Sequence, residues 1–577
     1  MDFKKDLVKA LAKAGVEETL AEQLLEAPSK REMGDFALPC FKLAAEMKKN
    51  PVLIAQEISA KIVLPKGFRK AEAKGPYINF FVEEGKQAKE TIGEILAKKE
   101  KYGIGKPAKG GDRIIVEYCQ ANPMKAFHIG HVRNIVLGEA IARLFEASGK
   151  KVFRANYGGD VGPHVSKTLY AYRELAHETE PKGIAEKGAW LGKLYKAGAD
   201  AVKEDEANNG ANGLEQKMRD MVVELESGKN KSLVADWKKL RKMSLEYFSS
   251  IYAELGIKFD RIILESEVEK EGIAIAHKLL EQGFAIRDQG ALLVNLEEHG
   301  LGKFLVLKSD GAALYSSKDL ALAKLKKKEI RARISYNLVG SEQAHYFRQL
   351  MKTIELLNQG NGDYCKTVHL SYEMVRLEGG KMSSREGNVI AYSELLDAVF
   401  SKTFTETMSR HPDWPKEKIE GTAKALAMGA IKFGMLCQDR NSVITFNWEK
   451  ATSLDGETAP FILYSHCRAN SILKKAGKLA KQKPKEIMPE TEKEKSLISM
   501  LAAFPEKAME AAEQESPHKV SFYLIALAQE FNSFYHEVPV LQAGPEKAVQ
   551  RIAIVRAVAQ VLENGLRLLN INTVEEM

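Results

Sequence analysis

The chain has 577 residues, of which 45% are hydrophobic and 28% charged, and its formal net charge is +8. This composition is typical of a folded globular protein and excludes disordered, collagen-like and coiled-coil chains. At about 150 residues per domain the length predicts three to five domains, and the small positive charge favours a polyanionic partner only weakly.

The five cysteines lie far apart and form no Cys-x-x-Cys pair. Neither a disulfide framework nor a zinc ribbon is therefore expected, and we predict free thiols in a reducing compartment. The N-terminal residues lack the apolar core of a signal peptide, and no apolar run approaches the ~20 residues of a membrane span. The sequence thus predicts a cytoplasmic protein with no dedicated metal site.

Residues 1–108 are expected to form a compact α/β domain. Leucines recur at helical spacing between Leu7 and Leu25, and the apolar, aromatic run Tyr77–Val82 predicts a strand. Gly and Lys dominate residues 101–112, as is typical of a linker or an exposed loop. We therefore expect a second domain to begin near residue 109.

Short apolar runs alternate with longer helical patterns from residue 109 to about residue 390. The clearest predicted strands are Arg113–Tyr118, Lys151–Asn156 and Ser335–Gly340. This alternation predicts an α/β domain with a doubly wound parallel sheet. Residues 183–250 are polar and helical in pattern, so we expect them to be a helical insertion in that domain.

The rest of the chain is expected to be helical. We predict a connecting helical region at 391–454 and a helical bundle at 455–577, where strand signals vanish and apolar residues recur with helical period. Six lysines lie between Lys474 and Lys485 with no acidic residue among them. This lysine-rich segment could neutralise nucleic-acid phosphates or could be a solvated linker.

The strongest local signal is His128-Ile129-Gly130-His131, which begins eleven residues after Glu117 on a predicted strand. The composition gives only about 0.02 chance matches to His-x-Gly-His. A helix beginning near His128 would bring free backbone N–H groups and two imidazoles together, as a phosphate site requires. Two satisfied surface histidines are the alternative, but the intervening glycine and the preceding strand favour a nucleotide site.

This segment resembles the first signature of class I aminoacyl-tRNA synthetases, HIGH, and Lys381-Met382-Ser383-Ser384-Arg385 resembles their second, the KMSKS loop. Other segments are similar to those of arginyl-tRNA synthetases, so that the resemblance covers essentially the whole chain. These segments are Gly34–Ala37, Val116–Pro123, Arg154–Gly162, Ser309–Asp319, Val339–Gln343 and Gln529–Tyr535.

The resemblance implies a Rossmann-like class I catalytic domain at 109–390, an N-terminal appended tRNA-binding domain at 1–108 and a helical anticodon-binding domain at 455–577. It implies arginine–tRNA ligase activity: ATP activates L-arginine to arginyl-adenylate, and the arginyl group passes to the 2′-hydroxyl of the terminal adenosine of tRNA(Arg). AMP and pyrophosphate are released. ATP with Mg²⁺, L-arginine and tRNA(Arg) are the implied cofactor and partners of a monomer without membrane contact.

The resemblance also implies an activation site in which His128 and His131 stabilise charge on the α-phosphate. Ser384 stands where the KMSKS loop usually offers a second lysine, and Lys125 is the expected substitute unless Arg385 alone suffices. The implied catalytic residues are His128, His131, Lys125, Lys381, Ser383 and Arg385. The implied ATP-binding residues are Phe127, His128, Gly130, His131, Gly340, His345, Lys381, Met382 and Ser383.

A guanidinium group requires planar carboxylate acceptors. By family position the arginine site would consist of Glu117, Asn122, Tyr315, Asp319 and Gln343. Tyr315 and Asp319 are four residues apart and would share one helix face. Asp319 is the expected guanidinium partner, with a surface pair to Lys318 as the alternative, while Glu117 would share that task or bind the α-amino group.

Contacts to tRNA are implied for aromatic and polar residues at both ends of the chain. They are Tyr77, Asn79, Phe461, Tyr464, Tyr535 and Met577. Stacking on unpaired bases is the expected mode for RNA loops. Aromatic residues at strand or helical spacing are equally common in a core, and this alternative stays open for each of them.

Other functions fit the sequence less well. Cysteinyl and methionyl synthetases usually need zinc clusters, and glutamyl synthetases lack an appended domain with the Gly34–Ala37 segment. A synthetase-like protein that binds tRNA without charging it is disfavoured by the intact His128–His131 signature and the mostly intact second signature. A nucleotidyltransferase would be shorter and would lack the C-terminal helical bundle.

Overall fold

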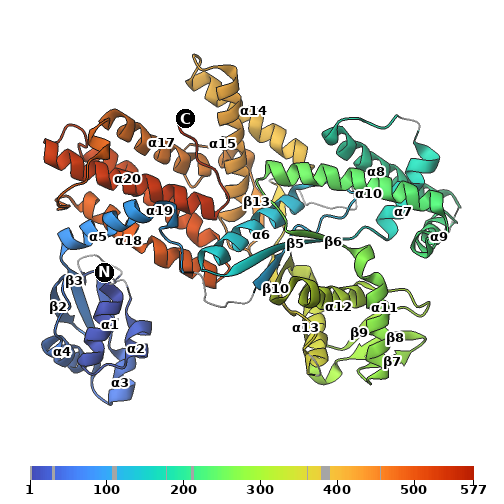
Figure 1. The fold of residues 1–577 in the computed structure, drawn as a ribbon, viewed down its shortest axis with the longest axis horizontal. Coiled ribbons are helices and arrows are strands. Elements are labelled where there is room, and N and C mark those ends of the chain that lie inside the picture. The colour runs from blue at the N-terminus through green and yellow to red at the C-terminus, as the bar shows by residue number, and fades with distance from the viewer. Residues whose placement is uncertain are drawn as a thin grey trace. The chain divides into compact units, whose positions relative to one another are not determined.

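A computed structural model of the chain describes residues 3–26, 28, 33–106, 113–176, 179–209, 213–359, 362–377, 390–454 and 456–577 (Figure 1). The chain divides into two compact units. The first comprises Met1–Tyr102, Ser465–Phe504 and Ala526–Asn564, and the second comprises Gly103–Tyr464, Pro505–Ile525 and Gly565–Met577. Across the described residues, none of the helices combines the length and the apolar character that crossing a bilayer requires.

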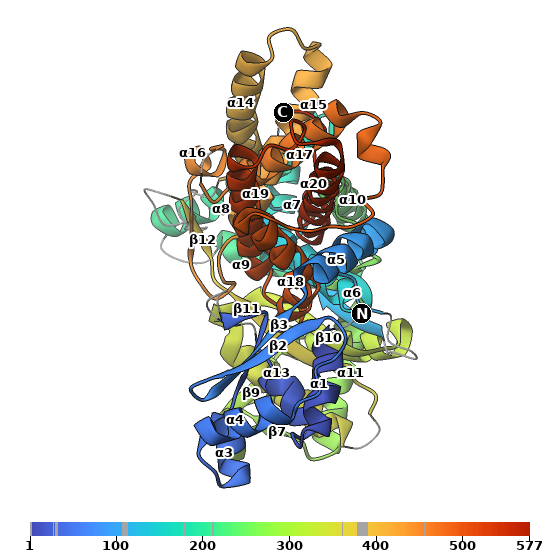
Figure 2. The ribbon, with the colours of Figure 1, turned by 90° about the vertical axis from the view of Figure 1, so that its left-hand side faces the viewer.

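The N-terminal part of the first unit is a small α/β fold with a three-stranded antiparallel sheet of order β1-β3-β2. Its strands are β1 (Phe36–Pro39), β2 (Phe68–Lys74) and β3 (Tyr77–Val82), and its helices are α1 (Phe3–Lys13), α2 (Glu18–Leu24), α3 (Phe41–Met47) and α4 (Pro51–Lys61). Figure 2 shows β2 and β3 paired beside α1. Alternate residues of β3, Ile78, Phe80 and Val82, join the leucines of α1 in one core.

The rest of the first unit is helical. Its elements are α5 (Glu84–Lys98), η2 (Lys99–Lys101) and η7 (Leu479–Lys481), together with parts of α17 (Ala459–Ala476), α18 (Glu492–Glu513), α19 (His518–Glu537) and α20 (Pro545–Leu568). Two long-range hydrogen bonds join the segments: the Tyr102 hydroxyl donates to the Leu501 carbonyl (2.9 Å), and the Asn564 amide donates to the Lys99 carbonyl (2.9 Å). The predicted C-terminal helical bundle is confirmed.

The second unit is organised around a five-stranded parallel sheet of order β11-β10-β4-β5-β6. The strands are β4 (Arg113–Glu117), β5 (Lys151–Gly158), β6 (Arg261–Leu264), β10 (Ala332–Gly340) and β11 (Lys366–Tyr372). The chain leaves β4 toward β5 and later returns on its other side as β10. The predicted doubly wound sheet is therefore confirmed, and its topological switch point lies between β4 and β10.

Helices cover both faces of this sheet. They are α6 (Ile129–Ala147), α11 (Glu265–Glu281), α12 (Tyr315–Leu325) and α13 (Ala344–Asn358). Residues from α11, α12 and α13 form one core with Ile115 of β4 and Ala155 of β5. Tyr118 points to the opposite face by strand alternation, and its ring lies so close to Gly138 of α6 that a Cβ there would come within 2.3 Å of it. The HIGH helix therefore covers the other face.

A helical insertion follows β5, as expected at 183–250. It contains α7 (Pro163–Tyr170), the π-helical turn η3 (Ala171–Leu175), α8 (Ile184–Asn209), α9 (Gly213–Ser227) and α10 (Lys231–Glu254). Apolar residues of these helices form their own core, which also includes Met124 from the segment before the HIGH helix. The insertion is thus packed directly against the chain that leads into the predicted nucleotide site.

A three-stranded antiparallel sheet in the second unit was not expected from the sequence. It consists of β7 (Ala285–Asp288), β8 (Ala291–Asn295) and β9 (Lys303–Leu307). Gln289 and Gly290 join β7 to β8 with φ angles of +48° and +85°, as in a two-residue hairpin turn. A Gln-Gly pair is a much weaker sequence signal for such a turn than Asn-Gly, which explains why the hairpin escaped prediction.

The region expected to be helical at 391–454 contains one short strand. Helices α14 (Tyr392–Arg410), α15 (Lys416–Leu436) and α16 (Trp448–Ala451) fit the prediction, but β13 (Ile444–Phe446) pairs in parallel with β12 (Val375–Leu377). Three residues are too few to give a recognisable strand pattern. The pairing joins this region to the end of the α/β domain.

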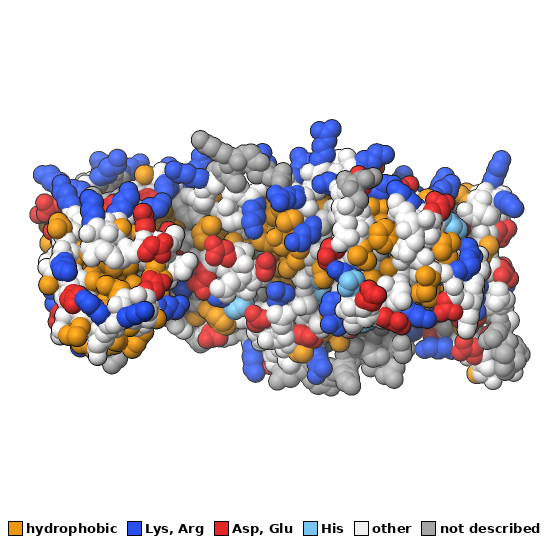
Figure 3. All heavy atoms as spheres, turned by 90° about the horizontal axis from the view of Figure 1, so that it is seen from below, with side chains coloured by type: hydrophobic (Ala, Val, Ile, Leu, Met, Phe, Trp, Pro, Cys, Tyr) orange, Lys and Arg blue, Asp and Glu red, His pale blue; other side chains and the backbone are white. Residues whose placement is uncertain are grey.

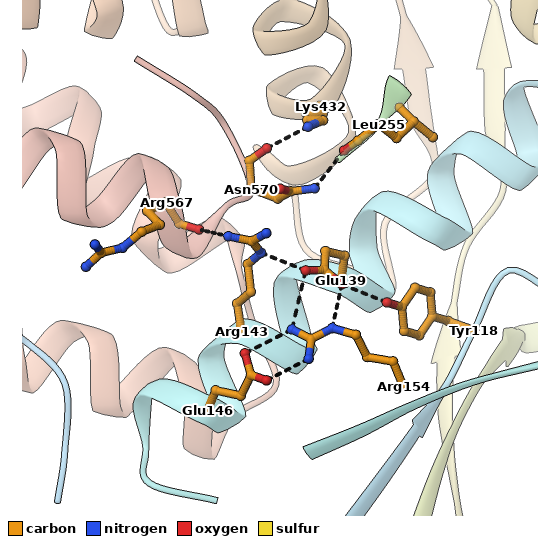
Figure 4. Close-up of polar contacts among 9 residues, drawn as sticks. All are labelled: Tyr118, Glu139, Arg143, Glu146, Arg154, Leu255, Lys432, Arg567 and Asn570. Carbon is orange, nitrogen blue, oxygen red and sulfur yellow. Dashed lines mark hydrogen bonds and ion pairs between the residues drawn. The ribbon is translucent and has the colours of Figure 1, made fainter. Parts of the chain in front are cut away.

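A buried polar network around Glu139 holds α6 in place on the sheet (Figure 4). Glu139, 2% exposed, accepts hydrogen bonds from the Tyr118 hydroxyl (2.7 Å), Arg143 Nε (2.7 Å) and Arg154 Nε (2.8 Å). Arg143 Nη1 also donates to the carbonyl of Arg567 at 3.1 Å. The Glu139 carboxylate thus ties the HIGH helix to the residue that follows β4 and to β5, and Arg143 extends the network to Arg567 near the end of α20.

A second set of contacts holds the same C-terminal segment. Lys432 Nζ on α15 donates to the Asn570 carbonyl (2.7 Å), and the Asn570 side chain donates to the Leu255 carbonyl at the end of α10 (3.0 Å). Burial lowers the pKa of Lys432 to about 8. Because these groups are buried, their hydrogen bonds are costly to lose.

The Glu139 network predicts a large loss of stability for Glu139→Gln. The amide keeps the shape of the side chain but leaves two partly buried guanidinium groups without their shared buried anion, which should cost about 3 kcal/mol. Glu146→Gln is the control, because the Glu146 side chain pairs with the same Arg154 at 2.6 Å but is 44% exposed. We expect a clear drop of the thermal midpoint for Glu139→Gln and a small one for Glu146→Gln; equal drops would contradict the role of the buried carboxylate.

Candidate active site

Two of the predicted site residues, Glu117 and Gly340, lie at the carboxyl edge of the central sheet. Glu117 ends β4, Gly340 ends β10, and these two strands flank the switch point. Ligands of doubly wound sheets bind in the crevice at this position. The HIGH helix lies on one face of the sheet and α12 and α13 on the other, so both faces supply side chains to the edge.

His128 and His131 cap the first turn of α6. His128 Nδ1 accepts a hydrogen bond from the Gly130 amide (3.1 Å), and His131 Nδ1 accepts one from the His128 amide (3.2 Å). The two rings stack with centroids 3.7 Å apart. Since Nδ1 is an acceptor in both rings, the proton of each neutral imidazole is on Nε2, which leaves two N–H donors at the start of the helix.

Both imidazoles are neutral in the physiological range. Burial, and after it the Lys125 ammonium, lowers the pKa of His128 to about 4. Burial, His128 and Lys125 hold the pKa of His131 well below its usual value. These histidines therefore act as neutral hydrogen-bond donors, and a positive charge at the site must come from another residue.

Lys125 is the cation whose charge acts on these histidines. Its ammonium lowers the pKa values of His128, His131 and also His164, so it lies near all three imidazoles. Nζ of Lys125 is 5.3 Å from the ring centroid of Tyr195 on α8. Burial and the neighbouring Lys167 lower its own pKa. That Lys125 replaces the missing lysine of the second signature stays a prediction.

The chain between β4 and α6 has an unusual backbone. Cys119, Gln120 and Met124 have positive φ angles of 80°, 48° and 68°. Side chains of distant elements hold this segment: Asn134 accepts from the Cys119 amide (2.6 Å), and Ser244 accepts from the Met124 amide (2.9 Å). Backbone strain of this kind is found at functional sites, where surrounding contacts maintain it.

The second signature, with Lys381, Met382, Ser383 and Arg385, lies outside the described residues. The chain that follows it is bound to the first signature. The Ile129 amide donates to the Ile390 carbonyl (3.1 Å), and the Tyr392 amide donates to the Phe127 carbonyl (2.9 Å). Residues 390–392, which follow the second signature in the chain, are therefore held by backbone hydrogen bonds at the start of α6.

Asp319 is a buried carboxylate at the other face of the edge. Its Oδ2 accepts a hydrogen bond from the Tyr346 hydroxyl at 2.6 Å. Burial raises the pKa of Asp319 to about 7, and the Tyr346 hydrogen bond opposes this rise. Lys318 is itself buried and pairs with Glu265 at 2.8 Å, which removes the surface pair that was the alternative for Asp319. Tyr315, one turn earlier on α12, is 63% exposed.

The other predicted arginine-site residues differ in how accessible they are. Glu117 is 2% exposed, pairs with Lys326 Nζ at 2.8 Å and accepts from the Asn337 amide at 2.9 Å. Asn122 accepts from the Gly159 amide at 3.0 Å. Gln343, in η6 (Ser341–Gln343) after β10, is exposed, and so is His345 at the start of α13. Gln343 and His345 can therefore reach a ligand at the edge directly, whereas Glu117 already has protein partners.

The predicted RNA-binding residues are distributed over both units. In the first unit Tyr77 packs edge-to-face on Phe41, whose side chain is 54% exposed, whereas Asn79 is 2% exposed. Figure 3 shows exposed hydrophobic side chains bordered by Lys and Arg at its left-hand end. Tyr535 is 42% exposed, and the Arg468 guanidinium lies 4.6 Å from its ring centroid.

Three further RNA-binding candidates belong to the second unit. Phe461 and Tyr464 are half-buried on α17. Met577 lies beside Pro460 and Arg410, with which it lines a small pocket. Part of each of these three side chains is therefore accessible to solvent.

Sequence reasoning missed three polar residues of the edge. Tyr346 donates to Asp319, Lys326 pairs with Glu117, and Tyr157 has a buried hydroxyl. Lys326 begins the π-helical turn η5 (Lys326–Ile330), which has no recognisable sequence signature. Tyr157 lies inside the Arg154–Gly162 segment, so the signal for it was present in the sequence.

The raised pKa of Asp319 predicts a pH-dependent stability. Because the folded-state pKa lies above the unfolded value of 3.8, the folded chain binds the extra proton more tightly, and stability falls as the pH rises from about 4 to 7. Asp319→Asn should therefore be more stable than the parent by on the order of 2–4 kcal/mol at pH 8 and indistinguishable near pH 4.

Thermal midpoints at the two pH values measure this difference. Asp288→Asn serves as control, because Asp288 forms an exposed ion pair with Lys303 (3.1 Å). A pH-independent difference between Asp319→Asn and the parent would contradict the buried, proton-binding carboxylate.

Comparisons with known proteins bear on this geometry. Family models match residues 91–448 (tRNA synthetases class I (R), catalytic domain), 462–577 (DALR anticodon binding domain) and 1–82 (Arginyl tRNA synthetase N terminal domain). The arginine–tRNA ligases of Clostridium botulinum (strain Loch Maree / Type A3) and Halothermothrix orenii are each 34% identical to this chain, with 100% of both chains covered.

Solved structures give the same correspondence. The arginyl-tRNA synthetase of Thermus thermophilus matches with a TM-score of 0.83 at 27% identity, and 100% of both chains is covered. That of Plasmodium falciparum matches with a TM-score of 0.77 at 17% identity, covering 100% of this chain and 99% of its own, and supports the fold alone.

Proposed function

Because the chain belongs to the arginyl-tRNA synthetase family of class I aminoacyl-tRNA synthetases, we propose that the carboxyl edge of its central sheet is where arginine is activated. Its activity is that of an arginine–tRNA ligase. In the first step of the proposed reaction, the arginine carboxylate attacks the α-phosphate of ATP and pyrophosphate leaves. The arginyl group then passes to the 2′-hydroxyl of the terminal adenosine of tRNA(Arg), and AMP is released.

The main support for placing the activation site here is the pair of neutral imidazoles at the start of α6. Their Nε2–H groups would donate to the α-phosphate oxygens, on which charge builds as the carboxylate attacks. Phe127 and Gly130 would accommodate the adenine, and Gly340 and His345 the ribose. Lys381, Met382, Ser383 and Arg385 would act on the β- and γ-phosphates. The hydrogen bonds of Ile390 and Tyr392 to the HIGH segment support this last assignment.

Mg²⁺ is proposed to enter bound to ATP. Within the described residues, no group of three His, Cys, Asp or Glu side chains is arranged to hold a metal ion. Mg²⁺ commonly relies on substrate phosphates for its ligands. Bound there, it would neutralise the leaving pyrophosphate.

Arginine is proposed to bind with its guanidinium toward Asp319 and Tyr315. Asp319 offers a buried carboxylate, and a paired guanidinium would compensate for the burial that raises its pKa. Asn122 and Gln343 would bind the amino-acid end. Glu117 already pairs with Lys326. We therefore propose that it helps to bind the α-amino group of arginine and not the guanidinium.

The tRNA is proposed to contact both ends of the chain. The match to an anticodon-binding domain at 462–577 fits tRNA as partner. Tyr535, Phe461, Tyr464 and Met577 would contact the anticodon loop. Tyr77, beside the exposed Phe41, would contact the tRNA elbow, and the buried Asn79 would support that strand from within. We also propose a cytoplasmic monomer; all five cysteines are free thiols in the structure.

ATP–pyrophosphate exchange tests the activation step. We expect exchange with L-arginine in the presence of total tRNA and none with the other amino acids. Exchange with a different amino acid, or none under any condition, would contradict the proposal.

Lys125→Ala should lower the rate of this exchange about 100-fold, since it removes the cation nearest the two imidazoles. Lys125→Arg should retain much of the activity because the charge remains. Lys193→Ala is the matched control, a lysine of α8 outside the proposed site. If Lys125→Ala exchanges at the parent rate, Lys125 does not replace the missing lysine of the second signature.

A further inference from the structure

Tyr157 has a buried hydroxyl without a hydrogen-bond partner among the described residues. Its ring packs against the core formed by α11, α12 and α13. A buried, unsatisfied hydroxyl costs free energy. Such a group therefore indicates a partner that the folded chain does not itself provide.

The position of Tyr157 in the sheet places it at the ligand edge. Glu117, the last residue of β4, pairs with Ala155 of β5. Tyr157 follows Ala155 by two residues, so it lies on the same face as Glu117 but beyond the end of β4. On its other side Tyr157 pairs with Ile263, two residues before Glu265.

The charges of four carboxylates act on this hydroxyl. Burial, followed by the charges of Asp319, Glu265, Glu117 and Asp160, holds the pKa of Tyr157 well above its usual value, so the phenol stays neutral.

Three of these carboxylates have cationic partners in the protein. Glu117 pairs with Lys326 (2.8 Å), Glu265 with Lys318 (2.8 Å) and Asp160 with Arg241 (2.7 Å). Asp319 has no ion pair among the described residues; its hydrogen bond comes from the neutral Tyr346. Tyr157 packs against the same core as Tyr346, the hydrogen-bond donor to Asp319, so the unpartnered hydroxyl and the unpaired carboxylate lie on the same side of the sheet edge.

We propose that Tyr157 is a specificity-determining residue for arginine, whose guanidinium donates one N–H to the Tyr157 oxygen while it pairs with Asp319. This inference rests on the proposed arginine site. A guanidinium has five N–H donors in one plane, and a single carboxylate cannot accept all of them. The neutral phenol adds a hydrogen-bond acceptor without adding charge. It therefore favours the planar guanidinium of arginine, with its several N–H donors, over the compact ammonium of lysine.

Tyr157→Phe tests the inference with little risk to folding. The change removes only the unsatisfied oxygen, so the thermal midpoint should stay the same or rise. We expect KM for L-arginine in ATP–pyrophosphate exchange to rise about 10- to 100-fold, as for loss of one buried hydrogen bond to a charged group. KM for ATP and kcat should change less than about 3-fold. Tyr364→Phe is the matched control, another buried tyrosine of the same core, and should leave all three values unchanged.

Asp319→Asn separates the inference from the proposed site. If Asp319→Asn raises KM for arginine while Tyr157→Phe leaves it within 2-fold, the role of Tyr157 is overturned and the site stands. If Asp319→Asn leaves KM unchanged, the proposed arginine site itself is wrong. A rise of KM for Tyr157→Phe accompanied by a similar loss in kcat or ATP binding would indicate a general disturbance of the edge and would also overturn the inference.

Discussion

The carboxylate of Glu139 is the constraint on which the rest of the catalytic unit depends. It accepts hydrogen bonds from Tyr118, Arg143 and Arg154. Tyr118 directly follows β4, Arg143 lies on α6 and Arg154 lies on β5. A single buried anion thereby sets where α6 lies on the sheet. Because α6 begins with the two capping imidazoles, the network also sets where their Nε2–H donors are presented, although it lies more than two turns away from them.

Burial has opposite effects on the pKa values of the groups on the two faces of the sheet edge. On the HIGH side it lowers the pKa of His128 to about 4, so that the imidazoles are neutral donors and Lys125 carries the charge. On the α12 side it raises the pKa of Asp319 to about 7. The ionised carboxylate would therefore be stabilised by a bound cation. In the proposed site, groups buried before a ligand binds would reduce the reorganisation needed when charge develops. This arrangement trades stability of the unliganded chain for affinity and rate.

The sequence predicted the parts of this molecule that depend on local pattern. The strand at Tyr77–Val82, the parallel sheet, the helical insertion and the helix start at His128 each follow from short-range periodicity or a motif, and the structure contains all of them. It could not predict the hairpin at Gln289-Gly290, whose turn residues are not typical, or the pairing of Glu117 with Lys326, which joins groups more than 200 residues apart through a π-helical turn. Asp319 was identified by its family position. That it lacks an ion pair could not be predicted, because Lys318 pairs with Glu265 instead, and this contact depends on tertiary packing.

The hydrogen bond from Arg143 to the Arg567 carbonyl has a consequence for biosynthesis. Its two residues are 424 positions apart in the chain. At roughly 5–20 residues per second of translation, the ribosome completes the HIGH helix on the order of 20–80 s before it delivers the segment that locks it. During that interval the sheet and α6 can form, but the helix is held only by its neighbours within the α/β domain. The second unit therefore reaches its final structure only after nearly the whole chain has been made.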